Sequence, residues 1–255
     1  MLVKIHHLNC GTMRPPAAPR MVAHCLLLET GRDLVLVDTG FAVGEDNLDA
    51  NFTRLVRPVL DPAEPALRQI RRLGLDPADV RHIVLTHLDP DHAGGLRDFP
   101  HARVHLHAAE LAAATDPAGA GERRRYRPAQ WAHRPDWAAY DDAGEDLLGL
   151  RARPLDGLDG VALVPLAGHS RGHSGVAVQT GEGWLLHAGD AYYFHGELAT
   201  PPYCPMLLRA AQRAVAVDHA RRLANLARLR ELAGQIEIFS AHDALELSRY
   251  EPSTA

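Results

Sequence analysis

Short apolar runs with Gly and Pro between them mark the first forty residues of the chain. Leu, Val and Ile dominate residues 2–8, 22–30 and 33–40. Runs of this length and composition, bounded by turn residues, are typical of strands. The pattern therefore predicts three strands at the start of the chain.

A helical period follows, and further strands and helices come after it. Leu67, Ile70 and Leu73 recur at helical spacing, which predicts a helix over residues 63–73 that stops at Gly74. The remaining predicted strands cover residues 82–86, 103–107, 161–166, 175–180, 184–189 and 237–242, and the remaining predicted helices cover 107–115 and 206–233. Two strand-rich halves around a helical middle favour an α/β sandwich over a regular βαβ repeat.

Residues 118–150 break this pattern. The segment is polar, has three consecutive arginines at 123–125, and carries Trp131 and Trp137. We interpret the chain as a single domain, residues 1–255, in which this segment is a surface insertion whose aromatic side chains pack together. A lid that lines a substrate site is the alternative.

Composition and charge exclude several classes of protein. The net charge of -5 gives no basic surface for nucleic acid, and no run approaches the roughly 18 apolar residues of a membrane span. The N-terminal MLVKIHHLNC lacks the apolar segment of a secretory signal. Three scattered cysteines argue against a disulfide framework. We therefore expect a soluble, cytoplasmic protein with no nucleic-acid or membrane partner.

Histidine is unusually frequent, and together with aspartate it gathers where strands end. The chain has sixteen histidines against five phenylalanines. The candidate donors at four predicted strand ends are His87, Asp89, Asp91, His92, His169, Asp190 and His242. A solvated polar turn explains LTHLDPDHAGG, residues 85–95, taken alone. Imidazole and carboxylate at four separate strand ends instead favour a site for zinc, iron or manganese.

Five short motifs resemble the metallo-β-lactamase superfamily and occur in its order. They are VDTG at 37–40, HLDPDH at 87–92, GHSRGHSG at 168–175, AGD at 188–190 and AHD at 241–243. The resemblance implies a four-layer αββα sandwich, the metallo-β-lactamase fold, with a dinuclear metal site at one edge. It also implies two divalent metal ions, for which zinc is favoured and iron or manganese are alternatives.

The same resemblance assigns each candidate donor to an ion. One ion would be held by His87, Asp89 and His169, the other by Asp91, His92 and His242, with Asp190 bridging both. Asp38 would fix a turn behind the site, and His173 would orient its neighbours; neither would bind an ion.

One position departs from the superfamily's pattern. Asp89 stands where the second residue of the motif is usually histidine. A carboxylate can bind the same metals, and it shifts the preference towards manganese or iron relative to zinc. Two histidines and one carboxylate are also the ligand set of non-haem iron enzymes, so oxygen chemistry at iron is a second hypothesis.

A serine hydrolase is a third hypothesis. GHSRG at 168–172 matches G-x-S-x-G, and Ser170, Asp190 and His242 follow the order of a serine-hydrolase triad. That motif requires a helix after the turn, whereas SGVAVQT predicts a strand. The triad also gives no function to the histidines and aspartates of the HLDPDH turn.

The resemblance implies hydrolysis by a metal-activated water, with Asp91 relaying a proton to the leaving group. Tyr193 lies three residues after Asp190, where N-acyl-homoserine lactonases of this superfamily place a tyrosine beside the scissile carbonyl. An aromatic anchor is its alternative role. We expect a lactone as the small-molecule substrate, with a thioester, as in glyoxalase II, and a phosphodiester as alternatives. The resemblance also allows a homodimer.

Overall fold

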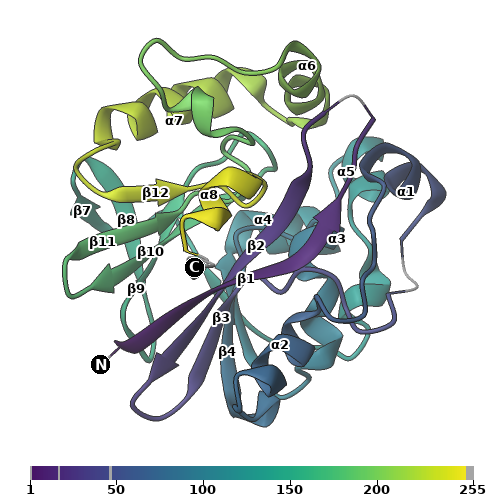
Figure 1. Cartoon of the computed structure of the whole chain (residues 1–255), viewed down its shortest axis with the longest axis vertical. Helices are drawn as coiled ribbons and strands as arrows, with labels where there is room; N and C mark the ends of the chain where they lie inside the picture. The colour runs from purple at the N-terminus through teal and green to yellow at the C-terminus, as the bar shows by residue number, and fades with distance from the viewer. Residues whose placement is uncertain (1, 17, 46–47, 251–255) are drawn as a thin grey trace, which may run out of the picture.

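Two six-stranded sheets make up the computed structural model, which describes residues 2–16, 18–45 and 48–250 (Figure 1). The first sheet has, in spatial order, β1 (Leu2–Met13), β2 (Met21–Thr30), β3 (Leu34–Val37), β4 (Val80–Val84), β5 (Arg103–His107) and β6 (Asp136–Tyr140). Its first three strands are antiparallel, and β3 to β6 are parallel.

The second sheet is mostly antiparallel. It has, in spatial order, β12 (Glu237–Phe239), β11 (Gly183–His187), β10 (Ser174–Thr180), β9 (Leu158–Pro165), β8 (Leu150–Leu155) and β7 (Glu145–Leu147). Its one parallel pair is β11 with β12. The strand nearest the C-terminus therefore lies at one edge of this sheet, and β7 lies at the other.

Helices flank both sheets (Figure 1). The α-helices are α1 (Ala50–Val56), α2 (Ala66–Arg72), α3 (Pro90–Ala93), α4 (Ala108–Thr115), α5 (Ala120–Arg125), α6 (Met206–Val215), α7 (His219–Leu232) and α8 (Ala244–Ser248). The short 3-10 helices are η1 (Pro77–Asp79), η2 (Gly94–Asp98), η3 (Pro128–Trp131) and η4 (His195–Glu197). Within the described parts of the chain, no helix is long and apolar enough to cross a membrane.

An apolar core fills the space between the two sheets. Val35 and Val84 from the first sheet belong to the same buried cluster as Val176 and Phe239 from the second. Side chains alternate across a strand, so the neighbour of Val84, Ile83, points to the outer face of the first sheet. A parallel strand such as β4 is thus apolar on both faces, as expected where both faces are covered.

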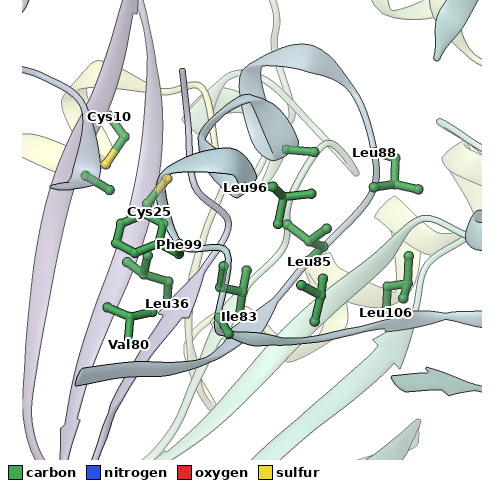
Figure 2. Packing of buried hydrophobic residues seen from close by; sticks show 14 of the residues in the cluster. Cys10, Cys25, Leu36, Val80, Ile83, Leu85, Leu88, Leu96, Phe99 and Leu106 are labelled. Carbon is green, nitrogen blue, oxygen red and sulfur yellow. The ribbon is translucent and has the colours of Figure 1, made fainter. Parts of the chain in front are cut away.

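Two further clusters attach the helices. Figure 2 shows part of the outer cluster of the first sheet, in which Ile83 and Leu36 pack with Leu96. On the second sheet, Leu226 and Leu229 of α7 pack in a cluster with residues of β9, β10 and β11. The layers are helices, sheet, sheet and helices, and the predicted four-layer αββα sandwich is confirmed.

The prediction of one helix over residues 206–233 was wrong, because the chain breaks between α6 and α7. The Val217 N–H donates to the carbonyl of His169 at 3.1 Å, and the Asp218 N–H donates to the carbonyl of Gly168 at 2.9 Å. The Asp218 side chain then caps the start of α7. The break frees two backbone donors that hold the loop carrying His169.

Residues 118–150, expected as a surface insertion, contribute to both sheets. Within this segment β6 pairs with β5, and β7 pairs with β8. Trp131 and Trp137 do contact each other, with ring centroids 6.5 Å apart. These elements are polar and short, so their hydrophobic periodicity is too weak to predict them from the sequence. The sequence did not predict α1, β8 and α8 for the same reason.

A buried glutamate forms hydrogen bonds with both the loop that follows β4 and the loop that follows β9. Glu110 of α4 is fully buried. Its Oε1 accepts hydrogen bonds from the Leu88 N–H and the Tyr126 hydroxyl, each at 3.0 Å. Its Oε2 accepts from the Ser170 hydroxyl at 2.7 Å and the Gly172 N–H at 3.0 Å. One carboxylate thus satisfies four donors that would otherwise be buried without partners.

We predict that the outer layer formed by α7 depends on Leu226. Leu226 is 1% exposed, whereas Leu223 of the same helix is 44% exposed. Leu226→Ala should lower the free energy of unfolding by about 2–5 kcal/mol, because it leaves a cavity. The matched Leu223→Ala should change it by less than about 0.5 kcal/mol. Urea denaturation measures both, and equal effects would contradict the packing described.

We also predict that Glu110→Gln destabilises the fold. An amide nitrogen in place of one carboxylate oxygen cannot accept hydrogen bonds, and each oxygen accepts two, so two donors lose their partner. The expected cost is about 1–3 kcal/mol of unfolding free energy. Glu182→Gln, at an exposed turn, is the control in the same denaturation experiment. A Glu110→Gln variant as stable as this control would show that the four hydrogen bonds are dispensable.

Candidate metal centre

Seven side chains from the loops after β4, β9, β11 and β12 form two neighbouring groups. The first group is His87, Asp89, His169 and Asp190, and the second group is Asp91, His92 and His242. Within each group the donor atoms lie within 4.8 Å of one another. The structure therefore brings together all the candidate donors found in the sequence, although Asp190, expected to bridge the two sets, is grouped with the first. Their role as metal ligands stays a prediction.

The local backbone explains why one turn serves both groups. The chain is still extended at Asp89, and Pro90 opens the short helix α3 directly after it. Pro is suited to the first helical position because its missing N–H needs no partner there. Asp91 and His92 then lie on the helical turn. The switch from extended to helical backbone separates the two pairs of donors.

A carboxylate behind the second group orients His92. Asp38, at a positive φ of 55°, accepts hydrogen bonds from the Thr86 N–H and the Thr86 hydroxyl, each at 2.8 Å. His92 Nδ1 lies 2.8 Å from the same carboxylate. Burial alone would raise the pKa of Asp38, but the charge and hydrogen bond of His92 outweigh it and lower that pKa. The ionised carboxylate turns His92 Nε2 towards the donors.

The donor atoms lack the partners that buried polar atoms normally have. His87 Nε2, His92 Nε2 and Asp190 Oδ1 are buried without a hydrogen bond. Asp190 Oδ1 nevertheless lies 3.2 Å from His92 Nε2 and 3.1 Å from His242 Nε2. His242 Nε2 also lies 3.2 Å from Asp190 Oδ2, within hydrogen-bond distance. Two imidazole nitrogens that face one buried carboxylate, one of them unpaired, fit a cation held between them. Asp190 and the residues of the second group together therefore fit a divalent metal.

The electrostatic field at the second group is negative. Burial would lower the pKa of His92 and of His242, yet Asp190 and the other nearby carboxylates raise both pKa values above the usual range of histidine. The site thus stabilises positive charge at these nitrogens. A metal cation satisfies the same field.

Arg125 enters the first group, and sequence analysis did not select it. Its Nε donates to Asp89 Oδ1 and its Nη2 donates to Asp89 Oδ2, both at 2.6 Å. Nη2 also contacts His169 Nε2. Burial would raise the pKa of Asp89, but Arg125 and His87 lower it well below its usual range. The available signal was the run of three arginines at 123–125, which does not say which of them turns inward.

Tyr193 lies beside both groups. Its hydroxyl is 3.4 Å from His169 Nδ1, and its ring packs edge-on against His242 with centroids 4.8 Å apart. Burial and the charge of Asp190 raise the pKa of the phenol well above its usual range. The hydroxyl therefore keeps its proton and can donate a hydrogen bond. Its expected role beside a reacting carbonyl stays a prediction.

The other polar residues noted in the sequence have supporting positions. His173 Nε2 accepts the N–H of Asp190 at 2.8 Å, and its Nδ1 lies 3.0 Å from the carbonyl of Leu166. It thereby orients the backbone that carries Asp190. Ser170 donates to Glu110 and is followed by strand β10, not by a helix. The strand–turn–helix context of a serine nucleophile is absent at this position.

Comparison with known proteins agrees with the fold. The sequence matches the family model of the metallo-beta-lactamase superfamily over residues 18–242. A probable metallo-hydrolase of Mycobacterium bovis is 45% identical over 251 residues, which cover 94% of this chain and 80% of that protein. An N-acyl homoserine lactonase of Azorhizobium caulinodans, AttM, is 30% identical over 203 residues, which cover 73% of this chain and 66% of that protein.

A solved structure gives the same result for the fold. An N-acyl homoserine lactone hydrolase, with the product N-hexanoyl-L-homoserine bound at its catalytic metal centre, superposes with a TM-score of 0.76 at 22% identity. The match covers 100% of this chain and 99% of that one. The chain therefore belongs to the metallo-β-lactamase superfamily and is a metallo-hydrolase.

Proposed function

We propose that this metallo-hydrolase cleaves an ester-type carbonyl, and that a lactone is its substrate. The observation that carries the proposal is the position of the protonated Tyr193 hydroxyl, 3.4 Å from His169 and directly beside the donor groups. The similarity to N-acyl homoserine lactonases supports the same substrate class. Thioesters and phosphodiesters are the competing classes.

The donor residues are suited to zinc. Imidazole nitrogen and carboxylate oxygen bind zinc, iron and manganese, and no cysteine belongs to either group. We propose zinc in at least the second group, Asp91, His92 and His242. A divalent ion held there supplies a Lewis acid and lowers the pKa of a bound water, so that a nucleophile forms near neutral pH.

Tyr193 and Asp91 would supply the remaining chemistry. A carbonyl oxygen gains negative charge as the tetrahedral intermediate forms, and a positioned hydroxyl stabilises it by donating a hydrogen bond. Tyr193 provides that hydroxyl. Asp91 lies 3.6 Å from His242 Nε2 through one oxygen. We propose that the Asp91 carboxylate takes up the proton that the attacking water loses and passes it to the alkoxide that leaves when the ester bond breaks.

An apolar cluster holds Tyr193 in place beside the donor groups. Met13, Met21, Phe41 and Leu208 form this buried cluster, and Tyr193 packs against it. The hydroxyl of Tyr193 therefore has a fixed position, which favours a hydrogen-bond donor that acts in a transition state.

We predict that the purified protein hydrolyses an N-acyl homoserine lactone with a higher kcat/KM than a thioester or a phosphodiester. Activity should disappear with a chelator and return with zinc. Ser170→Ala should keep turnover within a few-fold, because its hydroxyl supports Glu110 and is not a nucleophile. Assays of all three substrates, with metal content measured on the same sample, test this. Preference for a phosphodiester would refute the lactone. Activity that survives the chelator but needs Ser170 would revive the serine mechanism.

We predict that Tyr193→Phe lowers kcat by about tenfold to a thousandfold on the preferred substrate, the upper end being the effect of a lost oxyanion donor. Metal content should not change, because the phenol belongs to neither donor group. Tyr203→Phe is the matched control: Tyr203 is 56% exposed and its hydroxyl contacts His195. Wild-type turnover in Tyr193→Phe would leave this tyrosine a packing role only.

A further inference from the structure

The guanidinium of Arg125 is held on several sides inside the first donor group. Besides its two bonds to Asp89, its Nη1 donates to the carbonyl of His169 at 2.8 Å and to the carbonyl of Val215 at 3.0 Å. The side chain is 13% exposed. Both carbonyl partners belong to segments outside α5. The arginine is therefore fixed by the fold and does not simply lie along the surface.

Arg125 occupies the directions in which two donors would bind an ion. Asp89 Oδ2 lies 3.1 Å from His169 Nε2 and 3.2 Å from His87 Nε2, so these three atoms face one another. Nη2 of Arg125 donates to Asp89 Oδ2 and contacts His169 Nε2. A metal bound by this carboxylate oxygen and this nitrogen needs the same lone pairs. A guanidinium, whose charge is permanent, also repels a second cation at such close range.

The second group shows no such competition. Within the described part of the chain, Arg125 makes no hydrogen bond or ion pair with Asp91, His92 or His242. His92 Nε2 is buried without a hydrogen bond and faces Asp190. His87 Nε2 of the first group is also buried without a hydrogen bond, but its neighbours Asp89 and His169 are both occupied by the guanidinium. The two groups therefore differ at these two residues: Arg125 occupies them in the first group, and no arginine occupies the described donors of the second.

Charge balance points the same way. Asp89, Asp91 and Asp190 bring three negative charges to the two groups. One divalent ion and one guanidinium bring three positive charges, whereas two divalent ions and the guanidinium bring five. Uncompensated charge is costly in a buried site. Among the seven donor side chains, the guanidinium already compensates one of the three carboxylates, so a second divalent ion would meet less negative charge than the first.

We propose that this chain holds one tightly bound divalent ion, at Asp91, His92, His242 and Asp190, and that Arg125 takes the place of the second ion at Asp89 and His169. The proposal rests on the proposed metal-dependent function but changes the number of ions that the resemblance implied. It also explains why position 89 is an aspartate and not the histidine that is usual in the superfamily. An aspartate forms an ion pair with Arg125, which a neutral histidine would not do.

The test is the number of metal ions per chain. Metal-free protein would be titrated with Zn²⁺, and tightly bound metal counted by native mass spectrometry and elemental analysis. We expect one ion in the wild type and two in Arg125→Gln, because removal of the guanidinium frees Asp89 and His169. Arg124→Gln, an exposed neighbour in the same helix, should keep one. Co²⁺ in place of Zn²⁺ should give magnetic coupling between paired ions only in Arg125→Gln.

Arg125→Gln leaves Asp89 without its cation, and this variant could fail to fold for that reason. A second variant covers this case. Asp89→His with Arg125→Gln removes both charges together and should bind two ions. Two ions in the wild type would overturn this inference alone and leave the hydrolase function standing. Loss of an ion in Arg125→Gln would also overturn it, because the arginine would then position Asp89 as a ligand. A wild type without any tight metal would overturn both proposals.

Discussion

The concentration of negative charge between the loops is the constraint on which the rest of this centre depends. Asp38, Asp89, Asp91 and Asp190 lie within or directly against two groups of histidines, and almost no water reaches them. Carboxylates in such a place must be paired, hydrogen-bonded or bound to a cation. Three of these carboxylates are stabilised in three different ways. Asp38 has two donors from Thr86 and one histidine, Asp89 has a guanidinium, and Asp190 faces imidazole nitrogens without hydrogen-bond geometry at Oδ1.

Hydrogen bonds from residues behind the donors hold the loops that carry these carboxylates. Glu110 joins the loop after β4 to the loop after β9, and His173 fixes the backbone of Asp190. The gap between α6 and α7 adds two backbone hydrogen bonds to the loop that carries His169. Such supports restrict the donors to one arrangement and limit the entropy lost when a ligand binds. Their residues are dispersed over the chain and belong to different elements of the sandwich.

Sequence analysis found the donors because each has a local signal. His87, Asp190 and His242 stand shortly after apolar strands, in short motifs whose order is informative by itself. Arg125 and Glu110 have no such signal, since each acts across many residues on a partner in another element. Three adjacent arginines look alike in sequence, and the glutamate of α4 resembles any polar residue in an Ala-rich helix. The break before Asp218 was missed because the Val and Ala residues before it continue a helical pattern, and tertiary hydrogen bonds override it.

The last donor comes from the far end of the described chain. His242 follows the edge strand β12, its Nδ1 lies 2.8 Å from the carbonyl of Val22, and the His24 N–H donates to the carbonyl of Ala241 at 2.9 Å. The second donor group therefore joins a turn in the first half of the chain to a segment that is synthesised late and docks against β2. Closing such a long loop is entropically costly and slow compared with local folding. A nascent chain that still lacks these residues cannot assemble the group, so the centre can form only once the two halves of the sandwich have met.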